Sequence, residues 1–385
     1  MSVSVAVATS AVVGYRALSA GLKAVGLMAG GTRPLFPHIA LTVGEAGVTV
    51  TGADADASVE VSLPAIVEGP CRRVLVSWAE LAKVLPAAVK GLTKRALDQL
   101  DVAVVVSEDL EVSVGVGGYQ LPITVAADAV LPEIPATTPG THIVDRGEFV
   151  GMFDRVVAAA GTDQLLAVFT YVQTQLGETS VTMLATDRYR IARGSVPANG
   201  TLDQTILLPG ALISKVLGLC DGPQLTIGID DYAGTRWTTL HSGSVVVKLR
   251  APQLDFPRVA HLFDLPNPDT ATVDRAQLTA AAERAKAITA VLGERHEPAR
   301  LIIAPGTITI TPGVHHRTAA APQIPAETGV GATWTGGINP NYLANGLTHF
   351  TGETVTLIFT APGKPIKITG ADTFEHAIML MRLPE

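Results

Sequence analysis

Two kinds of landmark recur along this chain of 385 residues at an interval of about 130 residues. Residues 144–149 recur as residues 273–278, and in both copies an Asp stands where the pattern predicts the cap of a helix. An apolar strand that leads into a helix begins near Val74, Ile206 and Ile338, at steps of 132 residues. A period of this length is that of a whole domain. The sequence therefore predicts three equivalent domains.

Strand signals dominate, and most of them come in pairs that flank a short turn. The clearest pair is 39–43 with 48–51, around a turn that contains glycine. Helical patterns are few and include 78–85 and 276–292. Four further strand pairs are 102–106 with 110–116, 170–175 with 180–185, 225–229 with 238–241, and 301–304 with 307–311. Antiparallel hairpins with few helices predict an α+β fold rather than alternating βαβ units.

Two stretches rich in proline separate the predicted domains, at residues 131–140 and 265–269. They predict a first domain of residues 1–136, a second of 137–267 and a third of 268–385.

Composition excludes several classes of protein. Hydrophobic residues make up 47% of the chain and charged residues 16%, which is typical of a globular protein with large cores. The net charge of −7 argues against a uniformly basic surface for nucleic acid, although a local basic track stays possible. Cys71 and Cys220 fit neither a disulfide scaffold nor a zinc site. No signal peptide or membrane span is recognisable, so we expect a cytoplasmic protein without a membrane partner.

Two segments nearly two hundred residues apart set arginine beside apolar side chains, at residues 185–192 and 378–385. Neither segment carries a catalytic constellation. Arginine among apolar side chains suits a groove that binds another protein better than a pocket that transforms a substrate. We expect the two segments to meet in space.

Known catalytic and cofactor motifs are missing from the sequence. Gly363 and Lys364 lack the upstream glycine spacing of a phosphate-binding loop. His315 and His316 are adjacent in a strand-like segment, so their side chains would point to opposite faces and make poor metal ligands together. We therefore expect no metal, no cofactor and no enzymatic activity.

The two arginine-containing segments also carry a family resemblance. Residues 186–192 resemble the TDxxRLA signature of the bacterial DNA polymerase III beta subunit, the sliding clamp, and residues 379–383 resemble its MPMRL terminus. Residues 33–34, 256–257 and 339–343 agree with further landmarks of that family in the same order. The resemblance covers essentially the whole chain.

The resemblance implies an architecture and a function. Each chain would hold three like domains with antiparallel sheets outside and two helices each inside, and two chains would join head to tail as a ring of six domains. Double-stranded DNA would pass through the hole of such a ring without base-specific contacts. It binds DNA polymerase subunits, the clamp loader and repair proteins. Tethering of this kind raises the local concentration of a partner without catalysis.

The resemblance further implies a peptide groove between the second and third domains. Met side chains in such a trough adapt to several partners, and Arg190 and Arg382 are suited to hold peptide carbonyls or carboxylates. By position the groove comprises Phe169, Thr186, Arg188, Tyr189, Arg190, Ile191, Pro257, His261, Leu262, Ala377, Ile378, Met379, Leu380, Met381, Arg382 and Leu383.

This chain departs from the family pattern within the groove. The pair Arg188-Tyr189 stands where Gly or Arg usually precedes an aromatic residue or His. Leu380 replaces the usual Pro, and His261 stands where Arg is common, so a fixed charge becomes titratable. These departures predict a different peptide preference.

The residues implied to contact DNA are sparse: Arg33, Lys83, Lys215 and Arg284. Gly210 and Ala211 stand where basic residues are common, so we expect weak, salt-sensitive contact with DNA. Two function classes stay open. The first is a clamp that encircles DNA, and the second is a clamp-like paralogue that binds partner proteins or an inhibitor without loading on DNA.

Overall fold

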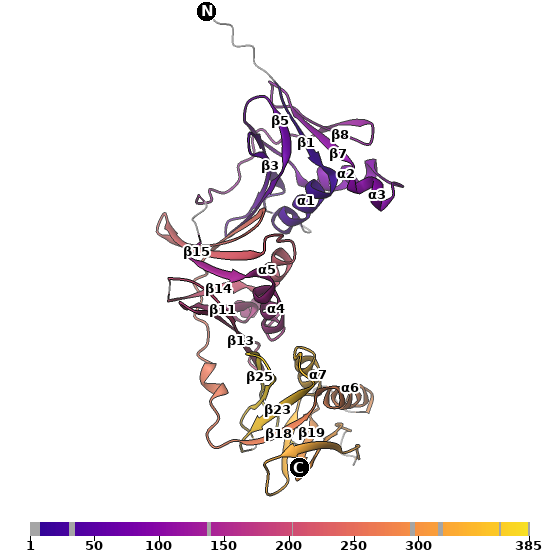
Figure 1. Cartoon of the computed structure of the whole chain (residues 1–385), viewed down its shortest axis with the longest axis vertical. Helices are drawn as coiled ribbons and strands as arrows, with labels where there is room; N and C mark the ends of the chain where they lie inside the picture. Colours follow the sequence, from indigo (N-terminus) through magenta and orange to yellow (C-terminus); the bar gives the residue numbers. More distant parts are fainter. Residues whose placement is uncertain are drawn as a thin grey trace, which may run out of the picture. The chain divides into compact units, whose positions relative to one another are not determined.

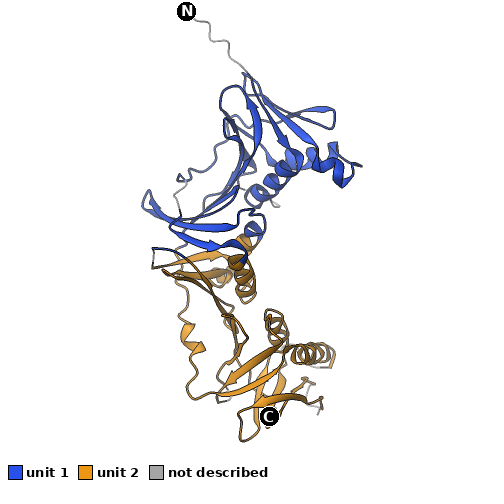
Figure 2. Ribbon diagram, in the orientation of Figure 1, with its two compact units in different colours: residues 1–147, 199–201, 215–252 blue, residues 148–198, 202–214, 253–385 orange. Residues whose placement is uncertain are grey.

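The computed structural model describes residues 8–30, 35–136, 140–201, 203–292, 297–314, 319–361 and 363–383 (Figure 1). The chain divides into two compact units (Figure 2). Unit 1 comprises residues 1–147, 199–201 and 215–252, and unit 2 comprises residues 148–198, 202–214 and 253–385.

Unit 1 contains two antiparallel sheets. The five-stranded sheet has the order β5 (Ala65–Glu68), β1 (Thr9–Gly14), β7 (Asp101–Val106), β8 (Val112–Val116) and β9 (Tyr119–Ile123). The eight-stranded sheet has the order β10 (His142–Asp145), β15 (Gln224–Tyr232), β16 (Thr235–Ser242), β17 (Val245–Arg250), β4 (Ala57–Leu63), β3 (Gly47–Ala53), β2 (His38–Gly44) and β6 (Arg72–Ser77). Buried residues alternate with partly exposed ones along most of β7 and along β8, as in strands with one face on a core.

Helices α1 (Tyr15–Ala29), α2 (Trp78–Ala88) and α3 (Lys94–Asp98) also belong to unit 1. Trp78 joins the first two: its Nε1 donates a hydrogen bond to the carbonyl oxygen of Leu22 at 2.8 Å. A Cβ at Gly26 would lie 2.5 Å from the Trp78 ring, so this close approach requires glycine.

Unit 2 contains one antiparallel sheet of twelve strands. Its order is β14 (Gln204–Pro209), β11 (Tyr171–Leu176), β12 (Ser180–Thr186), β13 (Arg190–Pro197), β25 (Glu375–Ile378), β24 (Ile366–Thr369), β23 (Thr354–Phe359), β18 (Asp269–Asp274), β21 (Ile324–Thr328), β20 (Thr307–Thr311), β19 (Ala299–Ala304) and β22 (Trp334–Ile338). Its helical segments are η1 (Gln164–Thr170), η2 (Ala260–Phe263), α6 (Arg275–Leu292) and α7 (Pro340–Leu347). Helices α4 (Arg146–Val157) and α5 (Gly210–Leu217) cross the division between the units.

The same order of elements occurs three times along the chain. A strand and a helix (β1–α1, β10–α4, β18–α6) precede a group of strands, and a second helix (α2, α5, α7) precedes three strands (β7–β9, β15–β17, β23–β25). All five predicted hairpins form, and Asp274 caps α6 because its Oδ1 accepts a hydrogen bond from the Gln277 amide at 2.7 Å. The predicted α+β class with repeated antiparallel sheets is confirmed.

Consecutive repeats share sheets, which the sequence did not indicate. Strand β17 of the second repeat pairs with β4 of the first, and β25 of the third repeat pairs with β13 of the second. The two compact units therefore divide the second repeat between them. The bounds 1–136, 137–267 and 268–385 stay a prediction.

Candidate partner-binding site

The two arginine-containing segments lie side by side in unit 2. Strands β13 and β25 pair antiparallel, with Arg190 opposite Ile378 and Ile191 opposite Ala377. The Met379 amide then donates a hydrogen bond to the carbonyl oxygen of Tyr189 at 2.8 Å. The prediction that the two segments meet is confirmed.

A tight turn precedes β13, and its own side chains build it. The Thr186 hydroxyl donates to the Arg190 carbonyl oxygen at 2.8 Å and accepts from the Arg188 amide at 3.1 Å. Oδ1 of Asp187 accepts from the amides of Tyr189 and Arg190, both at 3.0 Å. Thr and Asp commonly bind nearby backbone in this way. The turn holds Arg188 and Tyr189 exposed at its tip.

Arg190 is fixed from three directions. Its Nε donates to Oδ2 of Asp187 at 2.9 Å, and both side chains of this ion pair are 14% exposed. Its Nη1 donates to Oδ1 of Asn345 on α7, and its guanidinium lies 4.9 Å from the centre of the Tyr342 ring. Burial, followed by the Asp187 charge, raises the pKa of Tyr342. Arg190 therefore links the turn to α7, and the carboxylate of Asp187 neutralises the charge of its guanidinium.

A cavity of about 320 Å³ opens beside this turn. Phe169 reaches it from η1, which Asp163 caps by accepting the Leu165 amide hydrogen bond at 2.9 Å. Stacked against Tyr342, Tyr189 has its ring centre 6.3 Å from that ring. The lining residues are Ala160, Gly161, Thr162, Asp163, Leu166, Phe169, Asp187, Arg188, Tyr189, Arg190 and Tyr342.

An apolar cluster supports the strand pair from the side of η2. Its buried members are Leu184, Ile191, Phe263 and Ala377, and Phe256, Val259 and Leu262 pack against them while partly exposed. Burying this many apolar side chains stabilises the junction of β13 and β25.

The predicted groove residues divide by burial. Four are at most 2% exposed and lie beneath the surface: Thr186, Ile191, Ala377 and Ile378. Partly exposed are Phe169, Arg190, Pro257, Leu262, Met379, Leu380, Met381 and Leu383, and exposed are Arg188, Tyr189, His261 and Arg382. Of the whole set, the cavity is lined by Phe169, Arg188, Tyr189 and Arg190.

The terminal segment continues away from the cavity. The Met381 amide donates to the carbonyl oxygen of Gly337 at 2.8 Å, which attaches this segment to β22. A Cβ at Gly337 would lie 3.1 Å from the Leu383 side chain. Residues 381–383 therefore adjoin β22 and do not line the cavity.

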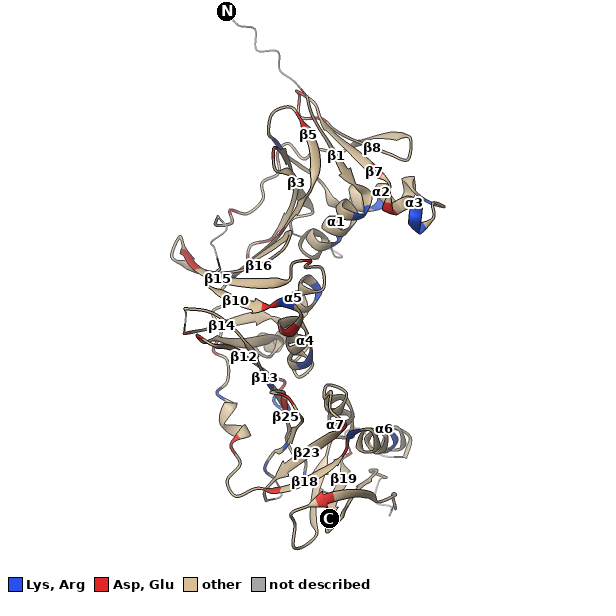
Figure 3. Ribbon diagram, viewed as in Figure 1, with Lys and Arg blue, Asp and Glu red and all other residues tan. Residues whose placement is uncertain are grey.

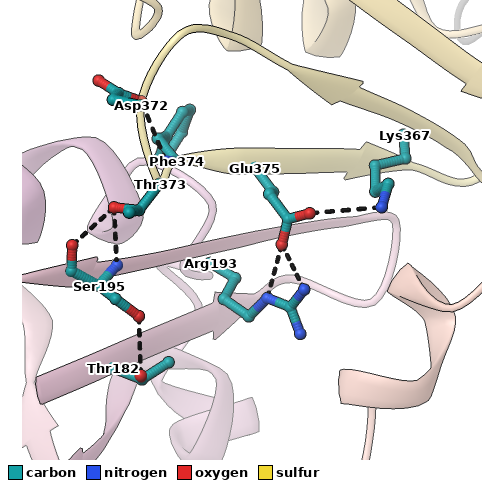
Figure 4. A network of polar contacts seen from close by, with 8 residues as sticks. All are labelled: Thr182, Arg193, Ser195, Lys367, Asp372, Thr373, Phe374 and Glu375. Atoms are coloured by element: carbon teal, nitrogen blue, oxygen red, sulfur yellow. Dashed lines mark hydrogen bonds and ion pairs between the residues drawn. The ribbon is translucent and has the colours of Figure 1, made fainter. Parts of the chain in front are cut away.

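A polar network fastens β13 to β25 (Figure 4). Nε of Arg193 donates to Oε2 of Glu375 at 2.7 Å, and Nζ of Lys367 donates to Oε1 of Glu375 at 3.3 Å. The Arg193 guanidinium also lies 4.4 Å from the centre of the Phe263 ring. Further along, the Thr373 hydroxyl donates to the Ser195 carbonyl oxygen at 2.6 Å. The network thus links β13 to both β25 and η2.

Two histidines lie near α7, close enough to Arg190 for its charge to act on both. His376 is 1% exposed, and neither of its ring nitrogens has a hydrogen-bond partner among the described residues. Burial, helped by the charge of Arg190, lowers the pKa of His376 to about 3. Burial and Arg155 also lower the pKa of His349. Both rings are therefore neutral near pH 7.

Sequence reasoning missed Tyr342, Asn345, Asp163 and Arg193. The landmark 339–343 contained Tyr342, but nothing in the sequence placed its ring against a turn about 150 residues earlier. Asp187 was within the signature, yet its ion pair with Arg190 depends on the turn geometry.

The basic residues predicted to face DNA lie on helices. Lys83 is on α2, Lys215 on α5 and Arg284 on α6, and all three are exposed, whereas Arg33 lies outside the described residues. Figure 3 shows Lys and Arg on α3, α5 and α6. The seven α-helices of the described chain hold eleven Lys and Arg against five Asp and Glu, a net charge of +6. The whole chain has a net charge of −7, so the residues outside these helices have a net charge of −13.

Comparison with known proteins agrees with this architecture. Residues 265–382 match the family described as "DNA polymerase III beta subunit, C-terminal domain". A beta sliding clamp of Streptomyces coelicolor is 24% identical over 363 residues, which cover 91% of this chain and 92% of that protein. One of Micrococcus luteus is 28% identical over 309 residues, covering 76% and 91%. The crystal structure of the DNA polymerase III subunit beta of Pseudomonas aeruginosa has a TM-score of 0.82 at 18% identity, covering 97% of this chain and 100% of that one.

The fold is therefore the three-domain clamp fold, built from repeated α+β units that share sheets. Within that class, the resemblance to the bacterial DNA polymerase III beta subunit, predicted from the two arginine-containing segments, is confirmed. Among the described residues, no helix is long and apolar enough to cross a membrane.

Proposed function

We propose that this chain is a DNA sliding clamp, a ring-forming processivity factor that encircles duplex DNA and tethers a replicative polymerase and other clamp-binding proteins. The observation that carries the proposal is the pairing of β13 with β25, which joins both family signatures in one site. The names of the relatives favour a clamp over the paralogue alternative. The proposed role is non-catalytic, because a closed ring holds its partner on DNA by enclosing the duplex. It is a role carried out in the bacterial cytoplasm.

The way in which the repeats join supports a closed ring. The last strand of the second repeat pairs with β4, and the last strand of the third repeat pairs with β13. The corresponding strand of the first repeat, β9, is at the edge of its sheet. We infer that β9 pairs with the third repeat of a second copy, near the β20–β21 hairpin that corresponds to β3–β4 and β12–β13. Two head-to-tail contacts then close a dimer and leave no such edge open.

Charge supports DNA as the occupant of the ring. The α-helices are net positive although the chain is acidic, and Lys83, Lys215 and Arg284 are exposed on three of them. Helices that line the hole would attract phosphates, while the acidic remainder would repel DNA from the rim. The small number of cations predicts weak contact that lets the ring slide.

The cavity and its surroundings support a peptide site. Phe169, Leu166 and Tyr342 provide apolar walls for one side chain, while Tyr189 and Arg188 at the mouth are exposed. Met379, Leu380 and Met381 extend partly exposed apolar surface beyond it. An extended peptide with hydrophobic anchors would cover both parts. We propose the full predicted set, from Phe169 to Leu383, as the partner groove, with the buried members as its support.

Retention on circular DNA tests the clamp. The full chain is loaded by a bacterial clamp loader onto a nicked circular plasmid and washed in enough salt to remove bound but unthreaded protein. We expect retention on the circle and rapid loss after one restriction cut, because a ring slides off an end. Equal retention on circular and linear DNA would contradict topological tethering.

A further inference from the structure

We infer that Arg188 selects partner peptides that carry a carboxylate beside the apolar side chain that enters the cavity. The inference rests on the proposed function, because it names the kind of peptide that the proposed groove accepts.

The backbone of Arg188 is strained. Its φ is +81°, in the left-handed region that a side chain with a Cβ disfavours and that glycine adopts without steric cost. Four of the described residues other than glycine have a positive φ, and Arg188 is the one among them that lines the cavity. Strain of this kind at a binding site points to a role for the side chain.

Two aromatic rings orient the guanidinium of Arg188. It lies 5.7 Å from the centre of the Phe169 ring and 5.5 Å from the centre of the Tyr189 ring. Contacts with ring faces do not use the N–H groups, so these donors stay available at the mouth of the cavity. A planar guanidinium held in this way can bind a carboxylate through two parallel hydrogen bonds.

The other charges of the cavity are already engaged. Arg190 pairs with Asp187, and Oδ1 of Asp163 accepts the Leu165 amide at the start of η1. Within the described residues, Arg188 forms no ion pair. Among the described side chains that line the cavity, Arg188 is therefore the one cation that a partner carboxylate can pair with.

The size of the cavity indicates where the carboxylate lies relative to the apolar side chain that enters it. A cavity of about 320 Å³ between Leu166, Phe169 and Tyr342 has room for one large apolar side chain. Because Arg188 lines the same cavity, a carboxylate within one or two residues of that anchor reaches the guanidinium. A peptide with an amide in that place forms a weaker, uncharged contact.

Matched peptides test the selection. The probes are capped octapeptides of alanine and serine that contain one Phe as the apolar side chain, with Asp or Asn at each flanking position in turn, titrated against the full chain by fluorescence anisotropy. We expect about tenfold tighter binding of the Asp peptide at one position, the usual scale for one charge-assisted contact. Arg188→Gly should reduce this ratio to about one, because the difference between the two peptides depends on the guanidinium.

A control separates the local contact from general attraction. Arg300 is exposed in unit 2 and does not line the cavity, so Arg300→Gln should keep the native Asp-to-Asn ratio. Native protein that binds both peptides equally, or a ratio unchanged in Arg188→Gly, overturns the selection and leaves the groove intact. Native protein that binds none of the peptides contradicts the groove itself, and this inference with it.

Discussion

At the scale of single residues, the left-handed backbone of Arg188 makes a prediction about stability. Arg188→Ala and Arg188→Gly both remove the contacts with Phe169 and Tyr189, but only Gly relieves a φ of +81°. We expect the Gly variant to be more stable than the Ala variant by about 1 kcal/mol in urea unfolding. Tyr189, which has no positive φ, is the control: there Ala should be the more stable. The same order at both positions would contradict the strain.

His376 predicts how stability depends on pH. Burial lowers its pKa from 6.5 to about 3, so the unfolded chain takes up the proton first as the pH falls. Stability is then lost from pH 6.5 downward, by up to roughly 1.4 kcal/mol per pH unit. Between pH 7.5 and pH 5.5 (about one unit below 6.5), His376→Leu should lose about 1 kcal/mol less than the native chain in urea unfolding. An identical loss in both would show that this histidine is not buried neutral.

At the scale of elements, Glu375 determines how firmly β25 is attached to β13. Its carboxylate meets both Arg193 and Lys367, and the three side chains are 30% exposed or less. Glu375→Gln leaves two partly buried cations without their carboxylate, so we expect a loss of about 1–2 kcal/mol and faster hydrogen exchange at the Met379 amide. Glu283 on α6 pairs with Lys286 at the surface, where Glu283→Gln should cost at most about 0.5 kcal/mol. Equal losses would mean that the network does not hold the strands.

Element by element, the sequence predicted local structure better than long-range pairing. Hairpins such as β2–β3 were predictable because alternation and a glycine turn specify them within a dozen residues. The pairing of β17 with β4 joins residues nearly 190 positions apart, and no local pattern encodes that register. The meeting of residues 185–192 with 378–385 was predicted only because both segments share an unusual composition. Tyr342 and Asn345 were missed since a helix face does not reveal its neighbour.

At the scale of the whole molecule, the edge strand β9 predicts how the proposed ring closes. Gly117 and Gly118 both have positive φ, as a two-residue hairpin turn of the type I′ requires. Tyr119 is therefore in the hydrogen-bonded pair with Val116, and the Gln120 N–H points to the open edge. Pro122, the next residue to face outward, has no N–H. Along β9, Gln120 is thus the one outward backbone donor for a second copy.

Replacing this donor tests the closure. The chain has a mass of 40.0 kDa, so native mass measurement should give a dimer of twice that mass. We expect Gln120→Pro to shift the equilibrium toward monomer by about tenfold or more, because it removes an N–H that would donate a hydrogen bond to the second copy. Gln120→Ala loses the same side chain, including its hydrogen bond to Ser113, but keeps the N–H and should stay dimeric. A native monomer would contradict the ring, and a dimer unaffected by proline would move the contact away from β9.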